Sequence, residues 1–130
     1  MGPMSRILVV DDDAQQLALH QHLLEIAGYQ VEIVLTASQT VRRLEHTPAD
    51  LVIMDLRLPN ADGEPDSREG MALIRGIRDI GYRAPVIVLC GWPEDLYGQP
   101  EEQLVSRILL KPIRTREFLN TISDLLTAAT

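Results

Sequence analysis

Three short runs of apolar residues limit the folds open to this chain more than any other feature of its sequence. They cover residues 7–10, 51–54 and 86–89, and they are rich in Val and Ile. Each run is apolar at consecutive positions, which is typical of strands buried on both faces of a parallel sheet. Weaker runs at residues 31–35 and 108–110 bring the expected number of strands to five.

The segments between these runs have the periodicity of helices. They cover residues 14–27, 38–45, 71–80 and 115–126, and Thr115 is expected to cap the last one. Gly28 and Gly81 stand where the first and third of these helices should end. Prolines and glycines break the period within residues 92–106, so we expect only a short or irregular helix over residues 100–105. Because strands and helices alternate, the sequence predicts an α/β fold, a doubly wound five-stranded parallel sheet with helices on both faces.

The length and charge of the chain limit its role. At 130 residues it is expected to form one domain, and its net charge of −7 argues against binding to nucleic-acid phosphates. Cys90 is the only cysteine and no apolar stretch is long enough to cross a bilayer, so we expect a soluble, cytoplasmic protein that does not bind membranes. Residues 1–3 are expected to be an expression remnant before a native start at Met4, which leaves residues 4–130 as the domain.

Charged residues stand where several of the apolar runs end. Asp11 and Asp12 follow the first run, Asp55 follows the run at residues 51–54, and Lys111-Pro112 comes after the last. The carboxyl ends of parallel strands meet at one edge of a sheet, so these side chains are expected to share one pocket. Carboxylates held together repel one another unless a divalent cation lies between them, and Mg²⁺ leaves coordination positions free for phosphate oxygens. A carboxylate between Mg²⁺ and an ammonium group is suited to attack phosphorus and form an aspartyl phosphate.

The residues around this pocket resemble those of a known family. The motifs are Leu-Val-Val-Asp-Asp-Asp at residues 8–13, Asp-Leu-Val-Ile-Met-Asp-Leu-Arg-Leu-Pro at residues 50–59, and Lys111-Pro112. Together they closely resemble the receiver domains of two-component response regulators, from residue 6 to about residue 126. The resemblance implies a flavodoxin-like sheet with the strand order 2-1-3-4-5.

The resemblance also implies roles for individual residues. Asp55 is implied as the phosphoacceptor, and Lys111 as a contact of the phosphoryl group. Asp12, Asp55 and the backbone carbonyl of Arg57 are implied as direct ligands of Mg²⁺, and Asp11 as a ligand through water. The implied phosphodonor is a phosphohistidine on a sensor histidine kinase or a histidine phosphotransfer protein. Such a domain is not an enzyme beyond its own phosphorylation and slow dephosphorylation, and a homodimer through the fourth helix, fifth strand and fifth helix is a further expectation.

One departure from the family pattern is an insertion after the third strand. The family usually enters its third helix after Asp-Gly or Ser-Gly, and both Gly63 and Gly70 are candidates for that glycine. Apolar residues fall at offsets of one, three, four and seven after Gly70, as in the family helix, whereas polar residues or glycine follow Gly63 at these offsets. We therefore expect seven extra residues (70 − 63) in a mobile, solvated loop over residues 60–70, and hypothesise that this loop gates access or partner choice. An unchanged phosphorylation rate and kinase preference after deletion of residues 64–70 would remove the hypothesis.

The residues through which the family usually couples phosphorylation to a conformational change also differ from the family pattern. Cys90 stands where the family has Thr or Ser, and a thiol is a much weaker hydrogen-bond donor than a hydroxyl. Ile108 replaces the usual aromatic residue three positions before the lysine, and Trp92 and Tyr97 are candidate substitutes for it. We expect phosphorylation at Asp55 to persist but to act through a non-standard switch. A small buried apolar side chain explains Cys90 at least as well as a redox role does.

Three histidines show no spacing that indicates a metal site. They are His20, His22 and His46. We expect them to be solvated or to cap helices.

Two other functions are weighed against this one. A phosphohydrolase of the haloacid dehalogenase type would use the Asp-x-Asp of residues 11–13, but Gln15 stands where that class has Thr or Val, and the chain has no room for a cap domain. A degenerate receiver, acting as a phosphorylation-independent interaction module, would explain the altered switch residues. Degenerate receivers usually lose one of the charged pocket residues, and all four are present here.

Overall fold

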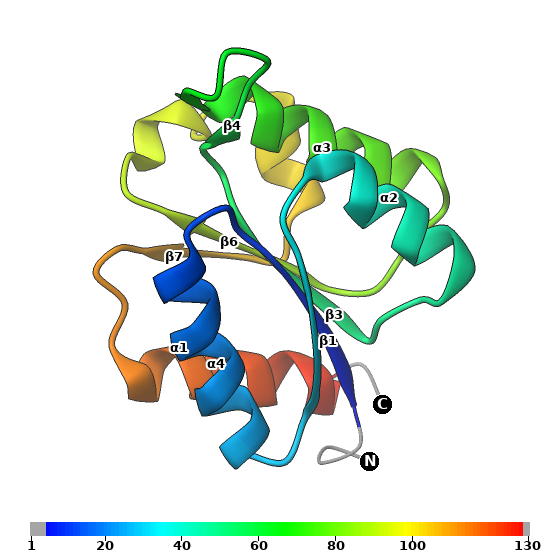
Figure 1. Ribbon diagram of the computed structural model, residues 1–130, viewed down its shortest axis with the longest axis vertical. Coiled ribbons are helices and arrows are strands. Elements are labelled where there is room, and N and C mark those ends of the chain that lie inside the picture. Colours follow the sequence, from blue (N-terminus) through cyan, green and yellow to red (C-terminus); the bar gives the residue numbers. More distant parts are fainter. Residues whose placement is uncertain (1–4, 129–130) are drawn as a thin grey trace.

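A five-stranded parallel sheet forms the centre of the protein (Figure 1). The computed structural model describes residues 5–128. The strands of this sheet are β1 (Arg6–Val10), β2 (Gln30–Val34), β3 (Leu51–Asp55), β6 (Val86–Cys90) and β7 (Arg107–Leu110). Their spatial order is β2-β1-β3-β6-β7. Counted along the chain, this is the predicted order 2-1-3-4-5, so the flavodoxin-like fold is confirmed.

Helices cover both faces of the sheet, as predicted (Figure 1). Helices α1 (Ala14–Ile26) and α4 (Thr115–Ala128) lie on one face, and α2 (Ala37–His46) and α3 (Ser67–Asp79) on the other. Each face has its own buried cluster, with Phe118 and Leu24 in one and Leu44 and Ile74 in the other. Every residue of β6 is buried, because helices pack on both sides of it. The consecutive apolar runs in the sequence therefore correspond to strands with two covered faces.

The chain between β6 and β7 forms 3-10 turns, in agreement with the short or irregular helix that we expected there. They are η2 (Pro93–Asp95) and η3 (Pro100–Leu104). The short helix expected from Pro100 is therefore present. Two arginines of α3 hold η3: Arg75 pairs with the buried Glu101, and Arg78 Nε donates to the carbonyl of Leu104 at 3.0 Å. Side-chain contacts with α3 thus hold this short segment in place.

The start of α4 differs by one residue from the prediction. Thr115 is the first residue of α4 and not its N-cap, because the amide of Phe118 donates to the carbonyl of Arg114 at 2.9 Å and so closes the first turn one residue earlier. The expectations for residues 1–3 and Met4 lie outside the described residues.

Within residues 5–128, no helix has the length and apolar character needed to cross a bilayer.

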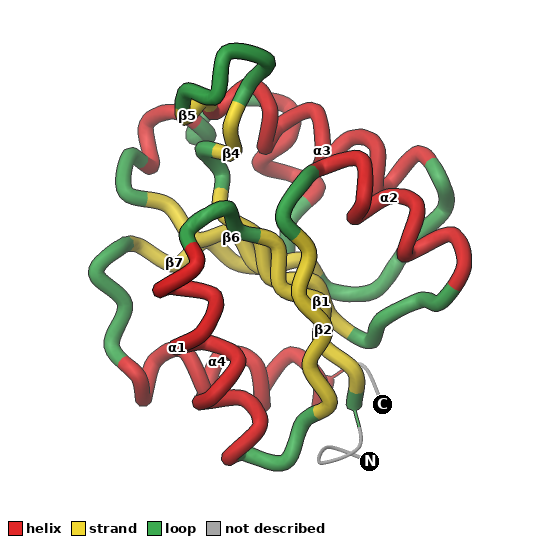
Figure 2. The backbone as a smooth tube through the Cα atoms, in the orientation of Figure 1, coloured by secondary structure: helices red, strands yellow, loops and turns green. Residues whose placement is uncertain are grey.

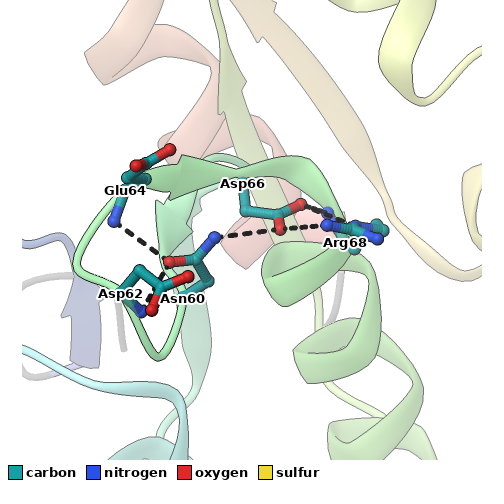
Figure 3. Close-up of polar contacts among 5 residues, drawn as sticks. All are labelled: Asn60, Asp62, Glu64, Asp66 and Arg68. Carbon is teal, nitrogen blue, oxygen red and sulfur yellow. Dashed lines mark hydrogen bonds and ion pairs between the residues drawn. The ribbon is translucent and has the colours of Figure 1, made fainter.

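The insertion after β3 forms a short hairpin, which we did not predict (Figures 2 and 3). Its residues 61–65 are exposed, which confirms that the insertion is solvated, and its mobility stays a prediction. Strand β4 (Leu58–Pro59) pairs antiparallel with β5 (Pro65–Asp66). The side-chain oxygen of Asn60 accepts from the amides of Asp62 and Glu64 at 2.9 and 3.1 Å. Its amide nitrogen donates to Asp66 at 3.3 Å. The polar residues that indicated solvation also supply the hydrogen bonds that order the turn.

Helix α3 begins earlier than predicted but in the predicted register. Asp66 caps the helix by accepting from the amide of Arg68 at 2.9 Å, so the helix starts three residues before Gly70. Leu73, Ile74 and Ile77 are buried, as the offsets from Gly70 predicted.

Gly70 allows α3 to lie against the backbone that follows Asp55. A Cβ atom at Gly70 would overlap the carbonyl oxygen of Leu56 and lie 2.7 Å from its carbonyl carbon. Leu56 is fully buried, so this backbone has little room to move away. The glycine is therefore required by the close approach of helix and strand end.

Gly70→Ala is expected to lower the free energy of unfolding by about 3 kcal/mol, because the new methyl group overlaps buried backbone. Gly76→Ala is a matched control in the same helix, since its Cβ would meet only the Val41 side chain at an ordinary 3.6 Å. Alanine is favoured over glycine inside a helix by roughly 0.5–1 kcal/mol, so the control should be neutral or stabilising. Urea denaturation of both variants measures the difference, and equal effects would contradict the steric explanation.

Candidate metal-binding and phosphoryl-binding pocket

Three carboxylates meet at the carboxyl edge of the sheet. Strands β1 and β3 pair in parallel, with Val10 opposite Met54, so Asp11 and Asp55 come next on adjacent strands. Oxygens of Asp11, Asp12 and Asp55 all lie within 4.8 Å of one another. The sheet therefore brings together residues that are more than 40 positions apart in the chain, as the alternation of strands and helices predicted.

Lys111 completes the cluster from the end of β7. Its Nζ lies 3.1 Å from Oδ1 of Asp55, and its backbone amide donates to the carbonyl of Cys90 at 2.9 Å. Lys111 is the only lysine of the chain, and the peptide bond between it and Pro112 is cis. A compact ammonium group on the carboxylate is suited to bind phosphoryl oxygens that arrive there.

Burial makes this cluster electrostatically unfavourable without a cation. Asp11 is 1% exposed, and burial, with smaller contributions from Asp55 and Asp12, raises its pKa to about 6. Burial also raises the pKa of Asp55, although Lys111 opposes the shift. One oxygen of Asp11, Oδ2, is buried without a hydrogen-bond partner among residues 5–128. An unpartnered buried oxygen beside two further carboxylates fits a hard divalent cation such as Mg²⁺.

The carboxylates and Lys111 line a cavity of about 340 Å³. Its other lining residues are Asp13, Leu56, Arg57, Pro65, Cys90, Gly91 and Trp92. Pro65 belongs to the β4–β5 hairpin, so the insertion borders this cavity as we expected from its position. The space is sufficient for a cation together with a phosphoryl group.

The two altered switch positions have different surroundings. Cys90 is 2% exposed and lines the cavity, and burial raises the pKa of its thiol, so the group stays protonated at neutral pH. Ile108 is half-buried in β7 opposite Val88 and packs against the core cluster on the α3 face. It does not line the cavity. Both candidate aromatic substitutes are exposed, but only Trp92 lines the cavity.

The side chain of Arg57 makes contacts that the sequence did not indicate. The family resemblance implied a role only for its backbone carbonyl, as a ligand of Mg²⁺. In the structure, its Nε lies 2.8 Å from Oδ2 of Asp95. Its Cζ lies 3.9 Å from the centre of the Trp92 ring. Because these partners are distant in the chain and follow no periodic pattern, only the folded arrangement shows the contact.

His20 is buried, contrary to our prediction of a solvated or capping residue. It is 6% exposed and stacks on Phe118 of α4 with ring centres 4.6 Å apart. Burial lowers its pKa, so the ring is neutral at pH 7. The signal was present in the sequence, because residues 17, 20 and 24 form one helical face and the other two are buried leucines. His22 and His46 are exposed, and Nδ1 of His46 lies 2.8 Å from the carbonyl of Arg42.

Comparison with known proteins places this pocket in a family context. The family model described as the response regulator receiver domain matches residues 7–123. The sensory/regulatory protein RpfC of Xanthomonas campestris pv. campestris is 33% identical over 123 residues, which cover 92% of this chain and 16% of RpfC. The transcriptional regulatory protein PrrA of Mycobacterium leprae is 29% identical over 84 residues, which cover 65% of this chain and 33% of PrrA. The chain thus spans a third or less of the length of these curated relatives.

Solved structures give the same family. The receiver domain of the sensor histidine kinase PA1611 from Pseudomonas aeruginosa is 27% identical, with a TM-score of 0.79 over 95% of this chain and 98% of that one. That structure has a magnesium ion coordinated in its active site cleft. A response regulator receiver domain protein from Clostridium thermocellum is 25% identical, with a TM-score of 0.83 over 97% of both chains.

Asp11→Asn is expected to raise the free energy of unfolding at pH 7 in the absence of divalent cations, by about 1–3 kcal/mol. The wild type must keep a buried carboxylate charged whose pKa is about 6 against a usual 3.8. Because the folded state binds this proton more tightly than the unfolded state, the wild type gains stability as the pH falls from 7 towards 4, and its difference from the variant shrinks. Urea denaturation at several pH values measures both effects.

Addition of Mg²⁺ is expected to stabilise the wild type more than Asp11→Asn, since the variant lacks one of the three carboxylates that are expected to hold the cation in the folded state. Asp62→Asn, at the exposed turn of the hairpin, removes the same charge away from the cavity and is the control. A loss of stability in Asp11→Asn at pH 7 without Mg²⁺ would contradict the electrostatic explanation.

Proposed function

Because this chain belongs to the family of response regulator receiver domains, we propose that it accepts a phosphoryl group on Asp55 and thereby regulates an output domain or partner. The observation that carries the proposal is the contact of Lys111 with Asp55 beside two further carboxylates. A single carboxylate that faces both an ammonium group and a cation site is the arrangement that phosphoryl transfer to an aspartate needs.

The transfer is proposed to take its phosphoryl group from a phosphohistidine of a sensor histidine kinase or histidine phosphotransfer protein. A carboxylate oxygen of Asp55 attacks phosphorus, the P–N bond to the imidazole breaks, and the leaving nitrogen keeps the electron pair and takes a proton. The product is an aspartyl phosphate and a neutral histidine. Lys111 neutralises charge on the phosphoryl oxygens during the transfer.

Mg²⁺ is the proposed cofactor, with Asp12, Asp55 and the carbonyl of Arg57 as direct ligands and Asp11 as a ligand through water. When bound, the cation neutralises the carboxylates and polarises the phosphoryl oxygens. The buried, unpartnered oxygen of Asp11 supports this assignment. The domain is proposed to act only on itself, by phosphorylation and slow dephosphorylation.

The conformational change that follows phosphorylation is proposed to differ from the family pattern, because Cys90 and Ile108 replace the usual switch residues. A protonated thiol at Cys90 is a weak donor, so it draws a phosphoryl oxygen less strongly than a hydroxyl would. Ile108 packs against the core and offers no aromatic ring that could rotate.

The homodimer expected through the fourth helix, fifth strand and fifth helix would here use η3, β7 and α4. We propose that residues 4–130 form this single receiver domain.

Incubation with acetyl phosphate and Mg²⁺ is expected to add the mass of one phosphoryl group to the wild type, because Asp55 is the nucleophile. Asp55→Asn should remove the increase, and Asp62→Asn should keep it. Intact-protein mass spectrometry measures both, and tandem mass spectrometry identifies the modified residue.

The absence of a mass increase in the wild type would contradict the proposal, and retained binding to a kinase would then favour the phosphorylation-independent interaction module. Modification of Asp11 in place of Asp55 would instead favour the phosphohydrolase.

A further inference from the structure

The guanidinium group of Arg57 connects the pocket to the segment that follows Cys90. Its Nε lies 2.8 Å from Oδ2 of Asp95, and its Cζ lies 3.9 Å from the centre of the Trp92 ring. One edge of the group therefore makes a charge-assisted hydrogen bond while its face lies on an aromatic ring. The contact joins the end of β3 to the chain beyond the end of β6.

The burial of this contact distinguishes it from an ordinary surface ion pair. The side chains of Arg57 and Asp95 are 33% and 20% exposed, and Trp92 is 52% exposed. Partly buried partners hold each other more firmly than two side chains in open water. The two contacts also restrain the guanidinium in different directions, so the side chain of Arg57 has little freedom.

The segment held by Arg57 has few other attachments. Residues 91–97 contain only the short turn η2, and Leu96 is the only one of these residues that is fully buried. The segment begins directly after Cys90, the altered switch residue, and its Trp92 lines the cavity. Leu96 anchors the segment in the core, and the contacts of Trp92 and Asp95 with Arg57 hold the part that borders the cavity.

We propose that Arg57 is a positioning residue that couples the cation site to residues 91–97, so that occupation of the site and the position of Trp92 depend on each other. The inference rests on the proposed function, in which the backbone carbonyl of Arg57 binds Mg²⁺. The carbonyl and the guanidinium belong to one residue, and each restrains the backbone that carries the other.

The coupling has a defined direction. The contacts with Asp95 and Trp92 hold the Arg57 backbone before the cation arrives, so they increase the affinity for Mg²⁺. Binding of Mg²⁺ in turn fixes this backbone and changes the surroundings of Trp92. By linkage, the two effects share one coupling free energy. The coupling of the cation site to residues 91–97 through Arg57 requires neither a hydroxyl group at position 90 nor an aromatic ring at position 108.

The experiment compares Asp95→Asn with Glu94→Gln. Both variants remove one negative charge from the same turn. Among the described residues, Glu94 is exposed and forms no ion pair with Arg57, and its charge acts on Arg57 more weakly than that of Asp95. Trp92 is the only tryptophan of the chain, so intrinsic fluorescence reports on its surroundings alone. Isothermal titration calorimetry measures Mg²⁺ binding independently of that signal.

In the wild type, Mg²⁺ is expected to change Trp92 fluorescence with the midpoint found by calorimetry. Asp95→Asn is expected to bind Mg²⁺ about fivefold more weakly or worse and to lose most of the fluorescence response. Glu94→Gln should behave like the wild type. Trp92→Leu, followed by calorimetry alone, should also weaken Mg²⁺ binding, which gives a second test that does not depend on the fluorescence of the variant.

Each other outcome overturns the inference in a recognisable way. If the wild type binds Mg²⁺ and Trp92 does not respond, or if Asp95→Asn binds as tightly as the wild type, the coupling is absent while the proposed function stands. If Glu94→Gln weakens binding as much as Asp95→Asn, the effect is one of general charge and not of the Arg57 contact. If calorimetry detects no Mg²⁺ binding to the wild type, both the proposed cation site and the coupling are wrong.

Discussion

The parallel pairing of β1 with β3 is the constraint on which the rest of this structure depends. Burial of apolar residues on both faces of these strands fixes their register, and the residues that follow are then forced together at one edge. Asp11 and Asp55 repel each other there, but the stability of the sheet holds them in place. The stability of the core thus maintains a cluster of carboxylates that would not form by itself, so the cluster is assembled before any ligand binds.

The insertion shows how added residues can be accommodated next to such a cluster. The backbone of Leu56 directly follows Asp55 and lies against Gly70, so both ends of the inserted hairpin are attached to buried structure. Asn60 orders the turn between them through its own side chain. Extra chain length therefore extends away from the sheet, while the end of β3 keeps the position that the carboxylate cluster requires.

The carboxylate cluster and the segment after Cys90 are held in place in different ways. Asp11, Asp12, Asp55 and Lys111 stand at the ends of strands, where the rigid sheet determines their separations. The segment after Cys90 has only 3-10 turns, and side-chain contacts of Arg57 restrain it. A segment held by a few contacts can shift at small cost in free energy, whereas a strand in the centre of the sheet cannot. Variation at Cys90 and Ile108 is thus compatible with an intact carboxylate cluster.

The sequence by itself determined the order of strands and helices along the chain and the register of α3 after Gly70. It also determined the edge of the sheet at which the pocket residues gather, namely Asp11, Asp12, Asp55 and Lys111. Each of these follows from periodic burial along one segment, which a linear pattern records. Only the tertiary structure decided that residues 58–66 form a hairpin and that the side chain of Arg57 reaches Trp92 and Asp95. These features depend on contacts between segments that are distant in the chain, or on polar side chains that bond to the protein in place of water, and neither leaves a repeating signal in the sequence.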